Sequence, residues 1–157
     1  MSKKGYTAHI YYNTGSYGSP TWSAIDIITD PDLPMKFDEI ESTTRASGGV
    51  KEFEPGLIDL GFSCKIKSDE SVTAYTALET AVLARSSVDI MVLDGGSTTN
   101  GSRGYRFDAK IFDWGQPQAI ADELYNTLVL KPCPSSNEKK SVVVTSGAPV
   151  FTTLAVA

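Results

Sequence analysis

Few residues in this 157-residue chain are of types that carry out chemistry. The single histidine, His9, lies in a short β-prone segment, and the two cysteines, Cys64 and Cys133, are far apart without a CxxC spacing. A zinc site or a Ser-His-Asp triad would have to use His9, and the chain has neither an HExxH nor a GxSxG motif. We therefore expect a structural role for His9, and no catalytic residue, metal site or cofactor.

Other patterns have both a chemical and a structural interpretation. Glu39 and Glu41 share one face of a predicted strand, and paired carboxylates can serve a glycosidase, although a solvated strand face looks the same. Residues 94–96, Asp-Gly-Gly, have the glycines of a phosphate loop but no following Lys-Ser/Thr, which favours a hairpin turn. Trp22 and Trp114 could line a sugar platform or fill a core. No pattern combines a nucleophile, a base and an orienting partner, so we expect a protein that is not an enzyme.

Composition and charge narrow the class of protein further. Hydrophobic residues make up 41% and charged residues 21% of the chain, close to globular averages. The 14 basic and 19 acidic residues give a net charge of −5 and a pI near 4.8, which disfavours binding to nucleic-acid phosphates or anionic membranes. We expect no transmembrane helix and no signal peptide, and a protein made in a cytoplasm.

Hydrophobic periodicity predicts a mainly antiparallel β fold with one helix. From Ile58 to Lys67, apolar residues alternate with polar ones, which places one face on a core and the other in water. A helix is expected over residues 69–85, with Asp69 as its N-cap and Arg85 in its last turn. Its apolar stripe, expected to pack on a sheet, consists of Ala74, Ala77, Leu78, Ala81 and Val82. The other predicted strands span residues 7–12, 22–29, 37–45, 88–94, 103–114 and 123–131, with turns at 30–34 and 95–102.

These elements indicate an antiparallel β-sandwich or partly open barrel of about seven strands, with one flanking helix. Residues 1–132 are expected to form the domain, and residues 133–157, beyond a Pro-rich break, a C-terminal extension or arm. Along residues 103–114, the alternation places Arg106, Asp108 and Lys110 on the solvent side of the sheet.

The order of several segments resembles the major tail tube proteins of long-tailed, siphophage-like bacteriophages. An acidic strand that ends in Thr-Thr-Arg, residues 38–45, is followed by a Gly-containing loop and by Glu-Pro-Gly-Leu-Ile-Asp at 54–59. Lys67-Ser68-Asp69 before the helix, the hairpin with Tyr105 and Phe107, and Leu128-Val129-Leu130-Lys131 extend the similarity over residues 20–132. The chain differs in lacking an additional immunoglobulin-like domain and in its apolar C-terminal extension.

The resemblance implies a structural virion protein whose hexameric rings stack into the tail tube, the conduit for DNA ejection into the host. The fold is shared with type VI secretion tube proteins. The implied partners are further copies of the chain and the tail terminator, tape measure and distal tail proteins. DNA would pass through without specific binding, and the monomer would not insert into a membrane. The implied location is the virion tail and, during assembly, the host cytoplasm.

The resemblance also suggests where assembly and transport would take place. An acidic lumen would repel DNA phosphates, and the candidate lumen-facing residues are Glu39, Glu41 and Asp59. The long loop at 46–56 is expected to be mobile in the monomer and to contact the next ring, with Phe53 as an anchor. The candidate inter-ring residues are Arg45, Val50, Lys51, Phe53, Pro55 and Gly56. The alternatives are a secretion-system tube protein, a carbohydrate-binding β-sandwich module and a hydrolase built on the carboxylates.

Overall fold

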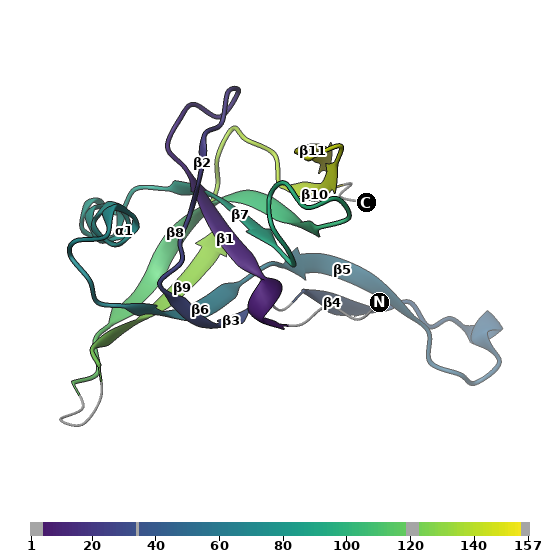
Figure 1. The fold of residues 1–157 in the computed structure, drawn as a ribbon. Coiled ribbons are helices and arrows are strands. Elements are labelled where there is room, and N and C mark those ends of the chain that lie inside the picture. Colours follow the sequence, from purple (N-terminus) through teal and green to yellow (C-terminus); the bar gives the residue numbers. More distant parts are fainter. Residues whose placement is uncertain (1–4, 34, 119–122, 155–157) are drawn as a thin grey trace.

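The computed structural model describes residues 5–33, 35–118 and 123–154. Pro34 of the predicted turn and residues 155–157 of the C-terminal segment lie outside the described residues. Within these ranges the chain forms eleven strands and one α-helix rather than the seven strands expected, and the predicted mainly antiparallel class with one flanking helix is confirmed (Figure 1). The elements are η1 (Gly5–Thr7), β1 (His9–Asn13), β2 (Trp22–Ala24), β3 (Ile28–Asp32), β4 (Lys36–Glu41), η2 (Arg45–Ser47), β5 (Phe53–Asp59), β6 (Phe62–Lys67), α1 (Thr73–Ala84), β7 (Val88–Leu93), β8 (Arg103–Gly115), β9 (Tyr125–Pro132), β10 (Lys140–Thr145) and β11 (Ala148–Thr153).

Nine of the described strands form one antiparallel sheet, and β4 and β5 form a separate two-stranded sheet. The hydrogen-bonded order of the large sheet is β2-β1-β7-β8-β9-β6-β3, and β10 pairs with both β8 and β11. The predicted hairpin of β7 and β8 is present, with Val88 opposite Ala109 and Leu93 opposite Gly104. Gly104 is required there, because a Cβ at this position would overlap the carbonyl oxygen of Val92.

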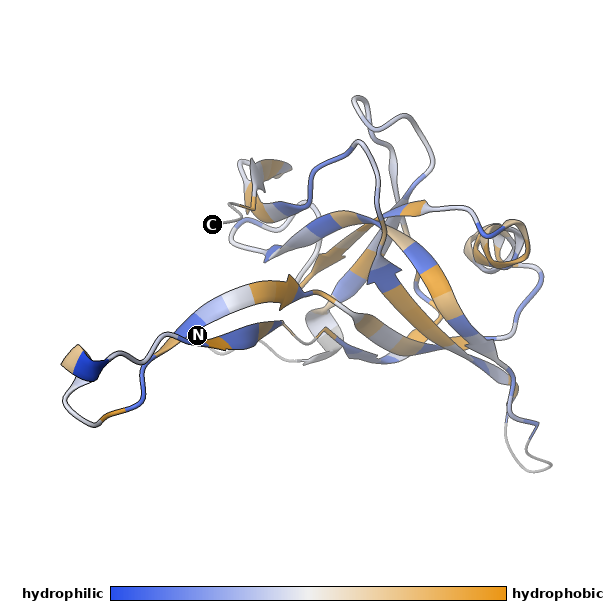
Figure 2. Cartoon of the chain, turned by 180° about the vertical axis from the view of Figure 1, so that it is seen from behind, coloured by the Kyte–Doolittle hydropathy of each residue, from blue (hydrophilic) through white to orange (hydrophobic). Residues whose placement is uncertain are grey.

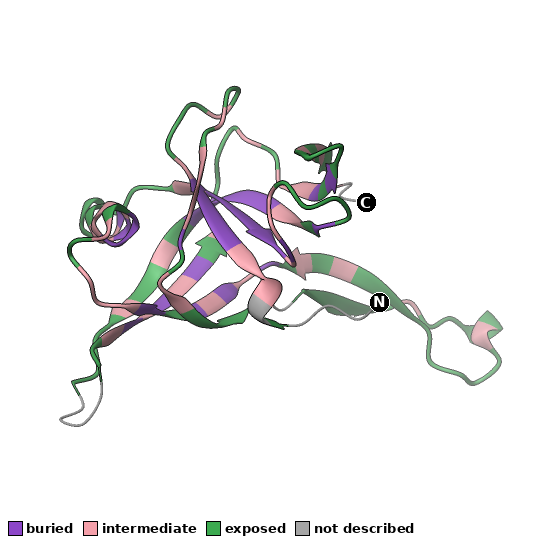
Figure 3. Ribbon diagram, in the orientation of Figure 1, coloured by how far each residue is buried: buried purple, intermediate pink, exposed green. Residues whose placement is uncertain are grey.

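The main hydrophobic core lies between the large sheet and α1, and buried residues are concentrated in the strands of the large sheet (Figure 3). Burial alternates along β6, with Phe62, Cys64 and Ile66 inside, as the period of two predicts. The single strand expected over residues 58–67 is nevertheless broken, because the backbone N–H of Gly61 donates to Asp59 Oδ1 (3.0 Å) and the chain changes sheets there.

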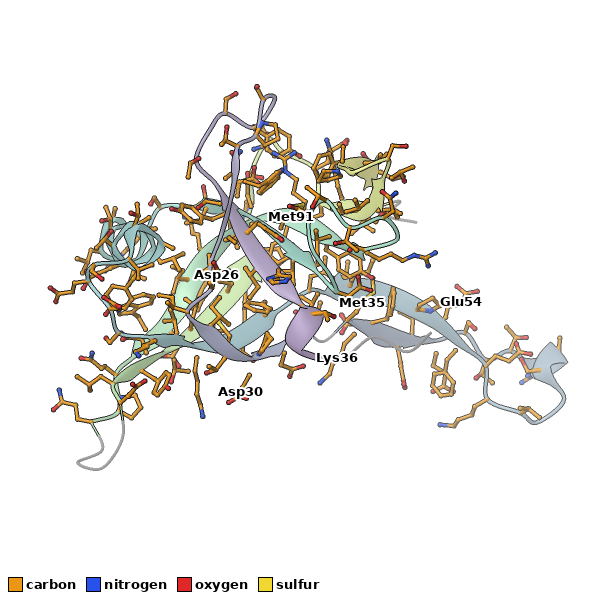
Figure 4. All side chains as sticks on the ribbon, in the orientation of Figure 1. Asp26, Asp30, Met35, Lys36, Glu54 and Met91 are labelled. Atoms are coloured by element: carbon orange, nitrogen blue, oxygen red, sulfur yellow. The ribbon has the colours of Figure 1, made fainter. Side chains whose placement is uncertain are left out.

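A second cluster of buried residues lies on the other face of the large sheet, beneath the β10–β11 hairpin. Met91, labelled in Figure 4, is fully buried at its centre. Because β10 pairs with β8, the apolar residues beyond Pro132 pack against the sheet. The cluster consists of Tyr11, Met91, Leu93, Val142 and Val144, with Trp22, Ala24 and Phe151 packed against it.

The helix is shorter than predicted, and Asp69 is not its N-cap. The Asp69 carboxylate accepts hydrogen bonds from Oγ (2.6 Å) and N (3.0 Å) of Ser71, and these bonds hold the pKa of that carboxyl below its usual range. Val72 is the N-cap and has no side-chain capping bond. At the other end Arg85 lies beyond the last turn, at φ 53°, and the N–H of Ser86 donates to Ala81 O (3.0 Å).

Two further predicted strands are interrupted or end early. Residues 22–29 form β2 and β3, because the chain turns after Ile25, which is buried and donates its N–H to Ile10 O (2.9 Å). Residues 30–32, expected as a turn, belong to β3, an edge strand that tolerates a proline and shifts its register. The strand expected at 37–45 ends at Glu41.

Candidate assembly interface

The β4–β5 hairpin, called here the arm (residues 35–59), projects from the body of the molecule (Figures 1 and 2). All six residues of β4 and five of the seven of β5 are exposed. Phe37 pairs with Ile58 and Glu39 with Pro55, so the register shifts by one residue between these pairs. The extra residue lies in β5 around Gly56, where a Cβ would crowd the Ile40 side chain and the carbonyl of Asp38.

The arm carries much of the apolar surface that the described chain exposes to solvent. Apolar and polar segments alternate along both strands in Figure 2. A two-stranded sheet without a packed face is marginally stable in water, and contiguous apolar surface marks an interaction site. The exposed large hydrophobic residues of the arm are Met35, Phe37, Ile40, Val50, Phe53 and Leu57.

The tip of the arm, residues 42–52, has its own hydrogen-bonded structure. The N–H of Ser42 donates to Glu52 O (2.9 Å), which closes the tip at its base. Thr44 caps η2 in a capping box with Ser47, and Ser47 Oγ donates to Glu52 Oε2 (2.8 Å). Gly48 ends η2 in the left-handed conformation, at φ 62°.

The arm is acidic. Three basic and six acidic residues between positions 35 and 59 give it a net charge of −3, out of −5 for the whole chain. In Figure 4 the side chains of Lys36 and Glu54 extend from its strands into solvent. Lys51 lies 3.7 Å from Glu41, and both side chains are largely exposed, so this pair contributes little to stability.

The three carboxylates expected to face a lumen do not share one face of the arm. Cross-strand partners lie on the same face, and successive residues alternate between faces. Glu39 and Glu41 therefore share a face, whereas Asp59, opposite Lys36, lies on the other.

The six candidate inter-ring residues divide between the tip and β5. Arg45, Val50 and Lys51 lie in the tip and are exposed. Phe53, Pro55 and Gly56 belong to β5, so the loop expected at 46–56 gives way to a strand at Phe53.

Solved structures share this architecture, although no protein-family model and no curated protein matches the sequence. A chain from the virion of a native gene transfer agent particle matches with a TM-score of 0.66 and 11% identity, over 96% of this chain and 99% of that chain. A chain of the SPP1 tail tube matches with a TM-score of 0.67 and 9% identity, over 98% of this chain and 80% of that chain. The chain has the fold of phage tail tube proteins.

The tail tube fold extends over more of the chain than residues 20–132. Because the matches cover 96% and 98% of the chain, they include β1 and the β10–β11 hairpin after Pro132. A chain of the anti-feeding prophage baseplate also matches, with a TM-score of 0.55 and 10% identity, over 87% of this chain and 91% of that chain.

In this tail tube fold, the predicted helix stripe lies largely on the main core. Ala74, Leu78 and Ala81 are buried, whereas Ala77 and Val82 are half-buried. Sequence reasoning missed Tyr75, which is 4% exposed and donates its hydroxyl to Asn126 Oδ1 (3.3 Å). Tyr75 follows Ala74 directly in α1, so it falls outside the i, i+3, i+4 spacing that predicts the stripe.

The cysteines, the histidine and the tryptophans considered for chemistry lie in or beside the hydrophobic cores or on a strand. Cys64 and Cys133 are buried free thiols, and burial raises the pKa of Cys64 to about 12. His9 is half-buried on β1, and Trp114 and Trp22 pack on different cores. Within the described ranges, no three His, Cys, Asp or Glu residues are grouped as a metal site, and no helix is long and apolar enough to span a membrane.

Arg106 and Asp108, expected on the solvent side of β8, are only 2% and 7% exposed. The guanidinium of Arg106 donates to both carboxylate oxygens of Asp89, from Nε (3.0 Å) and Nη2 (2.6 Å), and from Nη2 to Tyr17 O (2.9 Å). It lies 3.9 Å from the ring centroid of Tyr17 and 4.8 Å from that of Phe151. The prediction that Arg106 and Asp108 lie on the solvent side is therefore wrong, because residues distant in sequence cover this face of β8.

The remaining open face of the sheet carries several lysines. Lys110 and Lys131 are directly opposite on β8 and β9, and both are exposed. Neither forms a salt bridge within the described part of the chain, whereas Lys67 lies 3.0 Å from Glu123 on the same face.

Lys131→Glu should raise the free energy of unfolding by about 0.5 kcal/mol, because it turns a like-charge cross-strand pair into an opposite-charge pair. Urea denaturation at low salt would measure the gain. Lys110→Glu/Lys131→Glu is the control, since it restores a like-charge pair and should lose the gain. A decrease in stability of the single variant would contradict the prediction.

Proposed function

We propose that this protein is a structural, non-enzymatic subunit of a tail tube, which assembles into stacked hexameric rings. The observation that carries the proposal is the arm: an exposed hairpin with apolar residues along both strands, on a tail tube fold. An apolar two-stranded sheet gains stability when a neighbouring subunit covers it. A contact between two different surfaces of the same chain generates rings and filaments, whereas a two-fold contact stops at a dimer.

In the proposed tube, the arm reaches the adjacent ring. Phe53, which is 53% exposed at the junction of tip and strand, is the apolar anchor, and Val50 at the tip is 66% exposed. Thr43, Thr44, Ser47 and Glu52 of the tip are hydrogen-bonded to one another, which leaves the apolar side chains available for a partner.

Microscopy of the concentrated protein tests the proposal. Negative-stain images should show rings or tubes with six-fold symmetry, and size-exclusion chromatography should show higher oligomers that increase with protein concentration. A monomer at all concentrations that is stabilised by a glycan would instead identify a carbohydrate-binding module.

The tube is proposed to carry DNA without binding it. Glu39 and Glu41, on one face of the arm, are the carboxylates proposed to face the channel, where they repel phosphates. Phe53 pairs with Glu41 and ends this face, so the adjacent ring is proposed to cover the face only at its tip end. The proposed partners beyond the chain itself are the tail terminator, tape measure and distal tail proteins, and the proposed location is the virion. A secretion-system tube is the second candidate, favoured by the match to the anti-feeding prophage baseplate.

Glu39→Lys/Glu41→Lys should leave folding nearly unchanged, because both side chains are exposed, and should make assembled tubes retain DNA at low salt. Co-sedimentation of tubes with labelled DNA measures retention. Asp38→Lys/Asp59→Lys, with the same change of charge on the opposite face, is the matched control and should retain less DNA. Equal retention by wild type and the double variant would remove these two residues from the channel.

A further inference from the structure

A polar cavity of about 450 Å³ lies between the end of α1, β1 and the loop that follows β1. Neither the tail tube fold nor the arm accounts for it. Its floor is formed by β7 and β8, where Asp89 and Asp108 are directly opposite each other. Its lining includes Tyr12, Thr80, Ala81, Asp89, Asp108 and Asn137.

The two carboxylates of the cavity have unequal partners. Asp89 accepts both hydrogen bonds of the Arg106 fork and one from Asn13 Nδ2 (2.9 Å), so its charge is compensated. Asp108, only 7% exposed, accepts one side-chain hydrogen bond, from the neutral amide of Asn137 (2.7 Å). No cation of the described chain lies within 4 Å of the Asp108 carboxylate. A buried carboxylate usually has a cationic partner, because burying an unpaired charge is costly.

Of the cations near Asp108, Lys110 is exposed to solvent two positions along β8, and two others have partners of their own. Lys139 Nζ donates to Cys133 O (3.3 Å), and Lys140 Nζ lies 5.1 Å from the ring centroid of Tyr17. The described chain therefore forms no salt bridge with Asp108, and the cavity leaves this carboxylate open to a cation from outside.

The other walls also suit a cation on an aliphatic stem. The cavity is lined by Thr80 and Ala81, in the last two turns of α1, where the helix dipole favours positive charge. Ala77, Ala81 and Tyr12 provide an apolar wall, along which the methylene groups of a lysine or arginine side chain can lie.

We infer that this cavity is a binding site for a guanidinium or alkylammonium group, with Asp108 as its counter-ion. The source that the fold offers is Arg45 of a second copy, and this step rests on the proposed function. Arg45 begins η2 at the exposed tip of the arm, and it has no salt bridge within the described ranges. The tip lies on the opposite side of the molecule from α1 (Figure 1), so Arg45 cannot fill the cavity of its own copy, and an Arg45 in this cavity would come from another copy.

Binding of butylguanidinium to the dilute full-length protein tests the site itself. NMR titration should show shifts of the amides of residues 86–89, and Asp108→Asn should weaken binding at least tenfold. Asp113→Asn, on the exposed end of the same strand, is the matched control and should bind like wild type. Ser87→Trp, an exposed change at the rim, should block binding without touching the buried carboxylate. Equal affinity in wild type, Asp108→Asn and Ser87→Trp would overturn the site.

Disulfide cross-linking tests the source of the cation. Arg45→Cys/Ser87→Cys should give a ladder of cross-linked oligomers under oxidation at assembly concentration and none in dilute solution. The native cysteines are buried and do not compete. Arg45→Cys/Ser71→Cys, with the second thiol before the start of α1, is the control and should give no ladder. Tubes that form without the ladder would overturn the assignment to Arg45 and leave the proposed function standing, whereas absence of tubes in wild type would overturn the proposed function.

Discussion

Replacing residues 43–51 with an Asn-Gly turn should abolish tube assembly and leave a folded, soluble monomer. The tip contains no residue of either buried cluster, and its hydrogen bonds are made within residues 42–52. Shortening a loop changes the entropy of loop closure by a small amount, and a two-residue turn closes an antiparallel hairpin. The monomer should therefore keep its melting temperature within a few degrees, while negative-stain images show no tubes at concentrations at which wild type assembles.

A variant with an intact tip separates the loss of a contact from a change in the hairpin. Phe53→Ser keeps the length of the arm and removes its proposed apolar anchor, so it should raise the concentration needed for assembly about tenfold or more. Phe112→Ser, a change of another exposed phenylalanine, on β8, is the matched control. Full-length tubes from the shortened protein would contradict an inter-ring role of the tip.

The class of fold could be predicted because local periodicity and burial agree along most strands. In β6 the alternation of Phe62, Cys64 and Ile66 with polar residues is the burial pattern of the folded protein. The same logic predicted the hairpin of β7 and β8 and most of the helix stripe. These features require only that one face of each element is buried. They can therefore be predicted without knowing which strand lies beside it.

Strand ends were less predictable because they depend on single side chains. The Asp59 carboxylate accepts a hydrogen bond from the N–H of Gly61, where the predicted strand is broken. The Asp69 carboxylate accepts one from the N–H of Ser71, and the helix begins later than the apolar pattern predicts. Residues 53–56 of the predicted loop became part of β5 because they pair with β4, and pairing is not visible in a polar, proline-containing segment.

The parts that sequence reasoning missed are those that two distant segments build together. Nothing near Arg106 indicates that Tyr17 and Phe151 cover it, at separations of 89 and 45 positions. The cavity with Asp108 has the same origin, because its walls come from β1, α1, β8 and residue 137. A charged residue that alternates with apolar residues along a strand is ordinarily exposed to solvent. It is buried only where other segments of the folded chain cover that face.

Arg106→Ala should lower the free energy of unfolding by about 3–5 kcal/mol, because it leaves the Asp89 carboxylate mostly buried without its cation. The side chain of Asp89 is 12% exposed and that of Arg106 is 3% exposed, so water can replace little of the lost interaction. The same change removes the contacts of the guanidinium with the rings of Tyr17, Trp22 and Phe151. The covering of β8 by these residues should loosen, and the β10–β11 hairpin should become sensitive to proteases before the rest of the protein unfolds.

Denaturation in urea and limited proteolysis measure the two effects, with Lys110→Ala as the matched control on the same strand. Lys110 is exposed and has no salt bridge in the described part of the chain, so its loss should change stability by no more than about 0.5 kcal/mol. Asp89→Asn/Arg106→Met removes both charges and should recover part of the stability that Arg106→Ala loses, because no charge is left buried alone. If Arg106→Ala unfolds like the Lys110→Ala control, the pair does not hold the hairpin to the sheet.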